Sequence, residues 1–169
     1  ATTEIYTLSL HDALPIYSSG FTQIMGCYIQ TSPGLICRQA FAKSGGGIQF
    51  GEWEWVNPPM NLNTEYRTTE RYQGKPVYVK MVDCGALPNA GYKTVSVSAS
   101  GLEKVIDISG CVIDPSNGDF YSIPATNFSS PVHNVGLYAT GSQAIAISTQ
   151  SDRSSYNAYV KVKYTKTTN

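Results

Sequence analysis

Apolar and polar residues alternate in short segments along most of the chain. The clearest segment is 156–164, where apolar or aromatic residues take every second position and Lys161 and Lys163 lie between them. Successive side chains of a strand point to opposite faces, so this pattern predicts a strand with one buried face. The lysines are then expected on the solvated face, where they guard a sheet edge against pairing with another sheet. Similar alternation predicts strands at 76–83, 93–99, 103–114, 132–139 and 142–149.

The segment 103–114 contains both an alternating apolar pattern and a residue that interrupts it. Ile106 and Ile108 are two residues apart and are expected on the same face. Gly110 interrupts the alternation, as glycine does at a bulge or bend, and so predicts one there.

Turn-forming residues separate the predicted strands at intervals of roughly 8–12 residues, the spacing of small all-β domains. The turn segments are GALPNAG, SASG, DPSNGD, NFSSP, ATGS and QSDRSS. We therefore expect an all-β protein whose residues 61–169 form an antiparallel β-sandwich of jelly-roll-like type.

The preceding residues predict a smaller β segment. Two or three strands are expected, in the segments 21–30, 35–43 and 48–56, with the turn signals SPG and KSGGG between them. The sequence NPPM at 57–60 then removes two backbone donors and favours an extended linker. Residues 17–60 are therefore expected to form a small N-terminal β-hairpin or knob segment that ends in this linker.

The first sixteen residues do not fit this organisation. ATTEIYTLSLHDALPI lacks the positive start of a signal peptide, and His11 and Asp12 interrupt its apolar part. Back-translated, the segment resembles, without a mismatch, the adapter ligated to short-read sequencing libraries. We expect residues 1–16 to be a non-native artefact of a metagenomic assembly, with the natural protein extending upstream of Tyr17.

Composition narrows the range of partners. Lys and Arg together number 12, as do Asp and Glu, so bulk charge does not favour duplex nucleic acid or an anionic membrane. No apolar stretch approaches the roughly 20 residues that span a bilayer. We expect neither nucleic-acid binding nor membrane insertion.

The four cysteines give no metal signature. None of Cys27, Cys37, Cys84 and Cys111 forms a C-x-x-C pair, and a zinc site is not expected. The sequence leaves open whether Cys27 and Cys37 pair across a hairpin. We expect instead free thiols that act as small buried apolar side chains.

The residues also give no catalytic signature. His133 lies in an alternating segment and has no G-x-S-x-G turn beside it. Glu103 and Asp107 are four residues apart on one strand, about 13 Å, which is too far for a glycosidase pair. Asp114 and Asp119 flank the DPSNGD segment, where turn chemistry explains them better. We expect no enzymatic activity and no cofactor.

The same DPSNGD segment fails as a calcium loop, because Ser116 and Gly118 replace required ligands. No metal site is expected. Loop aromatics remain as binding candidates, since their flat apolar faces and polar tips suit sugar rings and protein surfaces. With their polar neighbours, the candidate binding residues are Asn117, Asp119, Phe120, Tyr121, Asn127, Phe128 and Tyr156.

Two segments carry a family resemblance. WEWVNPPM at 53–60 and EYRTTERYQGKPVYVKMVDCGALPN at 65–89 resemble the C-terminal region of tail fibre proteins from phages and prophages of gut Firmicutes. The closing AYVKVKYTKTTN looks like the end of the same proteins, and the part ending in GEWEWV is similar to the knob repeat of pyocin-type fibres. The resemblance covers nearly all of 18–169 and is weakest between 89 and 158, where fibres for different hosts are expected to differ.

The resemblance implies a non-enzymatic receptor-binding domain, in a homotrimer, that adheres to a bacterial surface polysaccharide or wall polymer. Its location would be the virion tail, assembled in the host cytoplasm and acting outside the cell. Two alternatives are a carbohydrate-binding module of a secreted bacterial glycosidase and a purely structural fibre segment.

Overall fold

The computed structural model consists of β-strands joined by turns, which confirms the predicted all-β class. It describes residues 20–27, 34–43, 47–126, 129–130, 133–141 and 143–167. The segment interpreted as an artefact, residues 1–16, lies outside this description. The chain divides into two compact units, 1–59 and 60–169, each described here by itself.

Unit 1 is a small antiparallel sheet built around one central strand. Its strands are β1 (Gly20–Cys27), β2 (Gly34–Ala42), β3 (Ile48–Phe50) and β4 (Glu54–Asn57). β1 pairs along the length of β2, while β3 and β4 pair with successive parts of β2. The single strand predicted at 48–56 is therefore two strands. Between them, the Gly51 N–H donates to the Gln39 carbonyl oxygen at 2.8 Å.

The register of the β1–β2 hairpin answers the question about two of the cysteines. Cys37 lies opposite Ile24, and Cys27 lies opposite Gly34. The two cysteines are thus at different levels of the hairpin, three residues apart along the strands. At about 3.4 Å per residue this separation is close to 10 Å, beyond the Cα distance that a disulfide spans.

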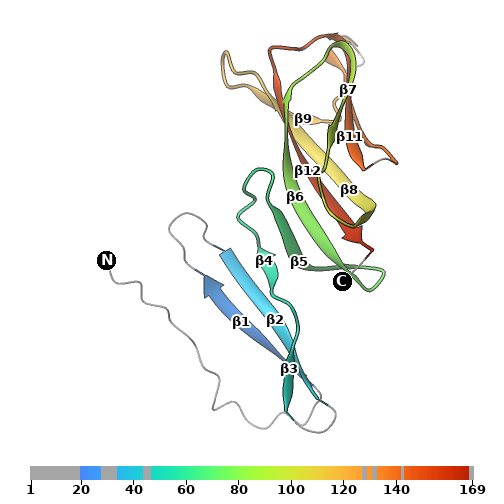
Figure 1. The fold of residues 1–169 in the computed structure, drawn as a ribbon. Helices are drawn as coiled ribbons and strands as arrows, with labels where there is room; N and C mark the ends of the chain where they lie inside the picture. The colour runs from blue at the N-terminus through green and yellow to red at the C-terminus, as the bar shows by residue number, and fades with distance from the viewer. Residues whose placement is uncertain are drawn as a thin grey trace. The chain divides into compact units, whose positions relative to one another are not determined.

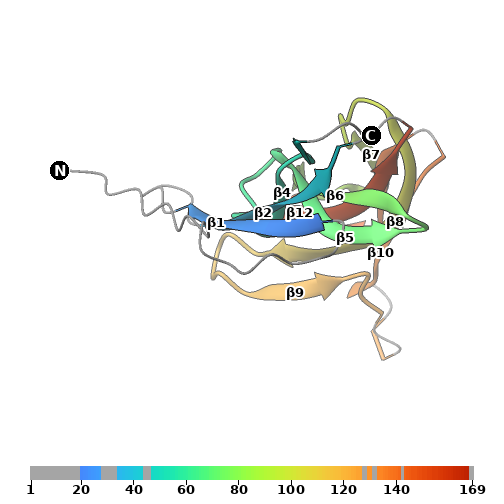
Figure 2. The same ribbon diagram turned by 90° about the horizontal axis from the view of Figure 1, so that it is seen from below.

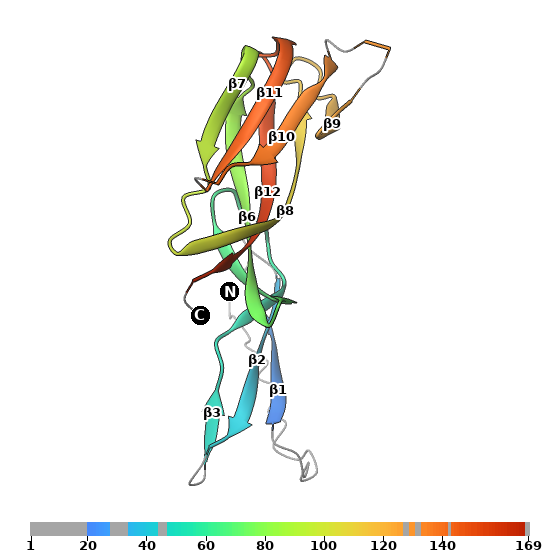
Figure 3. The same ribbon diagram turned by 90° about the vertical axis from the view of Figure 1, so that its right-hand side faces the viewer.

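Unit 2 contains two antiparallel sheets (Figures 1 and 3). The first has the order β5 (Glu65–Tyr72), β6 (Lys75–Ala86), β12 (Asn157–Lys166), β8 (Leu102–Ile113) and β9 (Phe120–Ile123). The second has the order β10 (Val135–Ala139), β11 (Ala144–Asp152) and β7 (Asn89–Ser96). β9 lies beside β8 at the edge of the first sheet (Figure 2).

The two sheets of unit 2 enclose one apolar core, which confirms the predicted β-sandwich. The first sheet contributes alternate residues of its central strands, and the second contributes Ile145 and Ile147 from β11. The fully buried residues of β12 are Ala158, Val160, Val162 and Tyr164, the face predicted from the alternation. Burying one such side chain contributes about 1.5–3 kcal/mol.

The predicted sheet edge at Lys161 and Lys163 is wrong. β12 pairs with β6 on one side and with β8 on the other, so it is an interior strand. The Lys163 Nζ instead donates to the Glu70 carboxylate at 2.7 Å on the outer face of the sheet. The lysines therefore solvate that face of the sheet and do not protect a strand edge.

The prediction of which residues in 103–114 face the core is also wrong. The register passes from Asp107 opposite Lys163 directly to Val105 opposite Tyr164, so Ile106 is the extra residue of a β-bulge. Val105 and Ile108 consequently pack against the core, in place of the expected Ile106 and Ile108.

Gly110 is not a bulge, because it lies in continuous register opposite Val160 on one side and Ile123 on the other. Glycine occupies this position for a steric reason. A Cβ atom added there would lie 2.7 Å from the Tyr159 carbonyl oxygen and 3.1 Å from side-chain carbons of Ile123 and Val160. Only glycine leaves room for these neighbours.

Three connections meet at one end of unit 2. They are the β8–β9 turn (114–119), the β11–β12 turn (153–156) and the short β6–β7 connection (87–88). The Arg153 N–H donates to the Pro88 carbonyl oxygen at 3.2 Å, and the Leu87 N–H donates to the Tyr156 carbonyl oxygen at 2.8 Å. These backbone bonds hold the β6–β7 connection and the β11–β12 turn together at the end of the sandwich.

Candidate functional site

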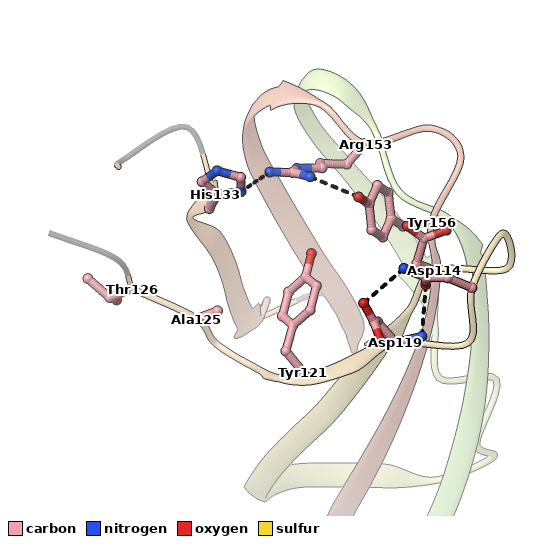
Figure 4. A pocket seen from close by; sticks show the side chains of 9 residues that line it. Asp114, Asp119, Tyr121, Ala125, Thr126, His133, Arg153 and Tyr156 are labelled. Carbon is pink, nitrogen blue, oxygen red and sulfur yellow. Dashed lines mark hydrogen bonds between the residues drawn. The ribbon is translucent and has the colours of Figure 1, made fainter. Parts of the chain in front are cut away.

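An open pocket of about 470 Å³ lies at this end of unit 2 (Figure 4). Its walls come from the β8–β9 turn, β9, the residues after β9, and the β11–β12 turn. The residues that line it are Asp114, Asn117, Asp119, Tyr121, Ala125, Thr126, His133, Arg153 and Tyr156.

Four of the binding candidates named from the sequence line this pocket: Asn117, Asp119, Tyr121 and Tyr156. Phe120 does not line it. This residue begins β9 with 74% of its surface exposed. Asn127 and Phe128 lie outside the described residues, directly after the pocket residues Ala125 and Thr126. The fold therefore brings together candidates that are up to 39 residues apart in sequence.

The β8–β9 turn is built by its own polar groups. The Asp114 N–H donates to the Asp119 carbonyl oxygen, and the Gly118 N–H donates to the Asp114 carbonyl oxygen, both at 2.8 Å. The Asn117 amide donates to the Asp119 carboxylate at 2.8 Å, and the Asp119 N–H donates back to the Asn117 Oδ1 at 2.9 Å. These bonds are the turn chemistry typical of Asp, Asn and Gly. They also fix the direction in which the turn presents its carboxylates.

Asp114 is held in its ionised form by the same turn. The Ser116 hydroxyl donates to its Oδ1 at 2.6 Å and the Ser116 N–H donates at 2.9 Å, which lowers the pKa of the Asp114 carboxyl. The Tyr156 hydroxyl and the positive charge of Arg153 lower that pKa further. The carboxylate is therefore an acceptor on the pocket wall.

Arg153 links the β11–β12 turn to the segment that precedes β10. Its Nη1 donates to the Tyr156 hydroxyl at 3.2 Å, and its Nη2 donates to the Nδ1 of His133 (Figure 4). Its Cζ lies 5.1 Å from the centre of the Tyr156 ring. A guanidinium has donors only, so the Nδ1 of His133 is the acceptor of this contact. His133 was predicted to lie within a strand, but it precedes β10, is exposed and borders the pocket.

Two tyrosines supply the apolar surface of the pocket. The ring centres of Tyr121 and Tyr156 are 6.5 Å apart with an interplanar angle of 62°, an edge-to-face contact. Both residues are partly buried and pack against the sandwich core. Figure 4 shows the Tyr121 hydroxyl pointing toward the side of the pocket that holds His133 and Arg153.

Two buried polar atoms in the pocket lack a hydrogen-bond partner among the described residues. They are the Tyr121 hydroxyl and the Nε of Arg153. Burial also raises the pKa of Tyr121, so its hydroxyl stays protonated and can donate. Buried polar groups are nearly always paired in folded proteins. Two unpaired donors in one pocket therefore indicate a place where a ligand or water accepts hydrogen bonds.

Sequence reasoning missed Arg153 and His133 as site residues. Arg153 lies in the predicted QSDRSS turn, which the Ser154 hydroxyl and N–H close by donating to the Asp152 carboxylate. Nothing in its local pattern distinguishes Arg153 from an ordinary turn residue. The described residues contain no group of three or more His, Cys, Asp or Glu side chains able to hold a metal ion. Likewise, no helix among them is long and apolar enough to cross a membrane.

The Asp114 carboxylate is expected to make the fold acid-sensitive. Its folded pKa lies below its ordinary value of 3.8, so its contribution is present above that pH and is lost as the pH falls through the folded pKa. Asp114→Asn should therefore lower the thermal unfolding midpoint at about pH 6 and match the wild type near about pH 2. Ser116→Ala should give a smaller loss with the same pH profile. A difference that is constant with pH would contradict this account.

Comparisons of the chain with protein-family models, with curated proteins and with solved structures find no match. The tail fibre resemblance therefore rests on the residues quoted for it above. The chemistry of the pocket rests on its geometry alone.

Proposed function

We propose that unit 2 is the receptor-binding domain of a phage tail fibre and adheres to a bacterial surface glycan or wall polymer through the pocket. The observation that carries this proposal is the pair of unpaired buried donors, Tyr121 Oη and Arg153 Nε, beside two tyrosine rings. Aromatic faces flanked by a few fixed polar groups suit the apolar and hydroxyl-bearing faces of sugars. The resemblance of 53–89 to tail fibres supplies the biological setting.

Binding without catalysis is the better interpretation of the two pocket carboxylates. A general acid needs a carboxyl whose pKa is raised, whereas the hydrogen bonds of Ser116 lower the pKa of Asp114. The Asp119 carboxylate is fixed by Asn117 at 2.8 Å as part of a turn. Both groups are arranged as stationary hydrogen-bond acceptors.

The alternatives make different demands on the pocket. A purely structural fibre segment has no use for unpaired donors, each of which costs about 1–3 kcal/mol when buried. A carbohydrate-binding module of a secreted glycosidase would use the same pocket in the same way. Neighbouring genes separate this last alternative from the proposal: tail, holin and lysin genes favour the fibre, and an upstream catalytic domain favours the module.

Affinity in a fibre would come from repetition as well as from each pocket. The resemblance implies a homotrimer, and three linked sites can raise the overall avidity 10²–10⁴-fold above that of one site. A weak single-site affinity is therefore compatible with firm attachment to a cell.

Tyr121→Phe is expected to weaken attachment without harming the fold. The change removes a hydroxyl that has no partner among the described residues, so the thermal midpoint should stay equal or rise. Adsorption of the labelled 169-residue chain to susceptible gut Firmicutes should fall about tenfold, the equivalent of one lost hydrogen bond.

The matched control is Tyr138→Phe, on β10, which is 52% exposed and does not line the pocket. It should change neither adsorption nor stability. Absence of adsorption by the wild-type chain across a broad panel of strains and glycans would contradict the proposed function. Equal adsorption by wild type and Tyr121→Phe would move the binding site elsewhere.

A further inference from the structure

The charges on the pocket wall limit which surface polymer fits. The side chains that line the pocket include two carboxylates, Asp114 and Asp119, and one guanidinium, Arg153. The wall is therefore net negative, and part of the Arg153 charge is already directed at Tyr156 and, through it, at Asp114.

The pocket contains both hydrogen-bond donors and hydrogen-bond acceptors. Tyr121 Oη and Arg153 Nε need acceptors, since neither has a partner among the described residues. Asp119 needs donors: its Oδ2 accepts from Asn117, and no described residue donates to its Oδ1. A phosphate or carboxylate group can satisfy only the first set and is repelled by the second. A sugar hydroxyl accepts and donates at once, and can satisfy both.

Accepting the proposed function, we infer that the pocket selects a neutral sugar through its hydroxyl groups and does not select the anionic groups of a wall polymer. In this arrangement one hydroxyl oxygen accepts from Tyr121 and Arg153. Another hydroxyl donates to Asp119, and the apolar face of the ring lies against the tyrosines. Phosphodiester-linked polymers are excluded unless they carry neutral sugar substituents.

Asp119→Asn separates the two ligand chemistries by the sign of its effect. The amide keeps an acceptor oxygen for Asn117 and leaves the backbone bonds of the turn unchanged. For a neutral sugar, loss of a charged acceptor should weaken binding about fivefold to tenfold. For an anionic ligand, removal of a repelling charge should strengthen binding. Asp107→Asn, on β8 and outside the pocket, is the matched control for net charge and should change nothing.

Binding to the 169-residue chain would be measured by titration and by competition with cell adsorption. The neutral probes are methyl glycosides of glucose, galactose and mannose and N-acetylglucosamine; the anionic probes are glycerol 3-phosphate, glucuronic acid and N-acetylneuraminic acid. We expect at least one neutral probe to bind and to compete, with less than twofold change between low and high salt.

The two levels of the proposal can fail separately. Binding of an anionic probe that weakens with salt and strengthens in Asp119→Asn overturns the inference of a neutral ligand. So does adsorption to cells that no neutral probe inhibits, although the proposed function then stands. Absence of adsorption overturns the proposed function itself.

Discussion

Gly110→Ala is expected to destabilise unit 2 by about 1–3 kcal/mol, the usual cost of adding a methyl group to a filled core. The added carbon would lie 2.7 Å from the Tyr159 carbonyl oxygen, an atom fixed by the pairing of β12 with β6 and β8. It would also lie 3.1 Å from side-chain carbons of Ile123 and Val160. Relief would require the interior strand or its edge neighbour β9 to move.

Urea unfolding followed by circular dichroism would measure this effect. Gly141→Ala is the matched control, because nothing lies within 4 Å of the position that its Cβ would occupy. Its unfolding midpoint should equal that of the wild type. Equal unfolding midpoints for Gly110→Ala and Gly141→Ala would show that β9 moves to accommodate the added methyl group. The close packing at Gly110 would then not constrain the fold. Since β9 carries Tyr121, we also expect Gly110→Ala to weaken cell adsorption.

Glu65→Ala is expected to cost about 1.5–3 kcal/mol, the range for losing hydrogen bonds to a charged group. The carboxylate of Glu65 on β5 accepts a hydrogen bond from the hydroxyl of Tyr164, a fully buried residue of β12. It also accepts from the Nζ of Lys166, which lies 4.6 Å from the centre of the Tyr78 ring. Without Glu65 the buried hydroxyl loses its acceptor and the ammonium loses its counter-charge.

Glu70→Ala provides the comparison, because Glu70 pairs with Lys163 on the surface with 52% of its side chain exposed. Exposed pairs contribute about 0.2–1 kcal/mol, so this variant should unfold close to the wild type. A double-mutant cycle with Tyr164→Phe tests the cause directly. In that background Glu65→Ala should cost at least about 1 kcal/mol less, because the hydroxyl is already absent. Additive costs would contradict the assigned contact.

The alternation of apolar residues predicted the strands of unit 2 well where one face of a strand is buried. Val160 and Val162 were placed correctly because alternation reports which side of a strand faces the core. The place of β12 inside the sheet was missed because alternation says nothing about which strands lie on either side. The bulge at Ile106 was missed for a related reason: an extra residue with an apolar side chain leaves the composition unchanged.

The pocket could be anticipated only in part. Asn117, Asp119, Tyr121 and Tyr156 stood out because polar and aromatic residues beside turns are common in binding loops. Arg153 did not stand out, because one of its partners, His133, precedes β10 and lies beside the β11–β12 turn only in the folded sandwich. Such contacts have no local signature in the sequence.

The interior position of β12 has a consequence for how the protein is made. Its backbone pairs with β6 and β8, strands that leave the ribosome earlier, and it supplies the fully buried Tyr164 near its end. A nascent chain that lacks residues 157–166 leaves β6 and β8 each with an unpaired strand edge, and such edges favour aggregation. Translation must therefore reach β12 before the sandwich can close, and a chain that terminates before β12 cannot complete its first sheet.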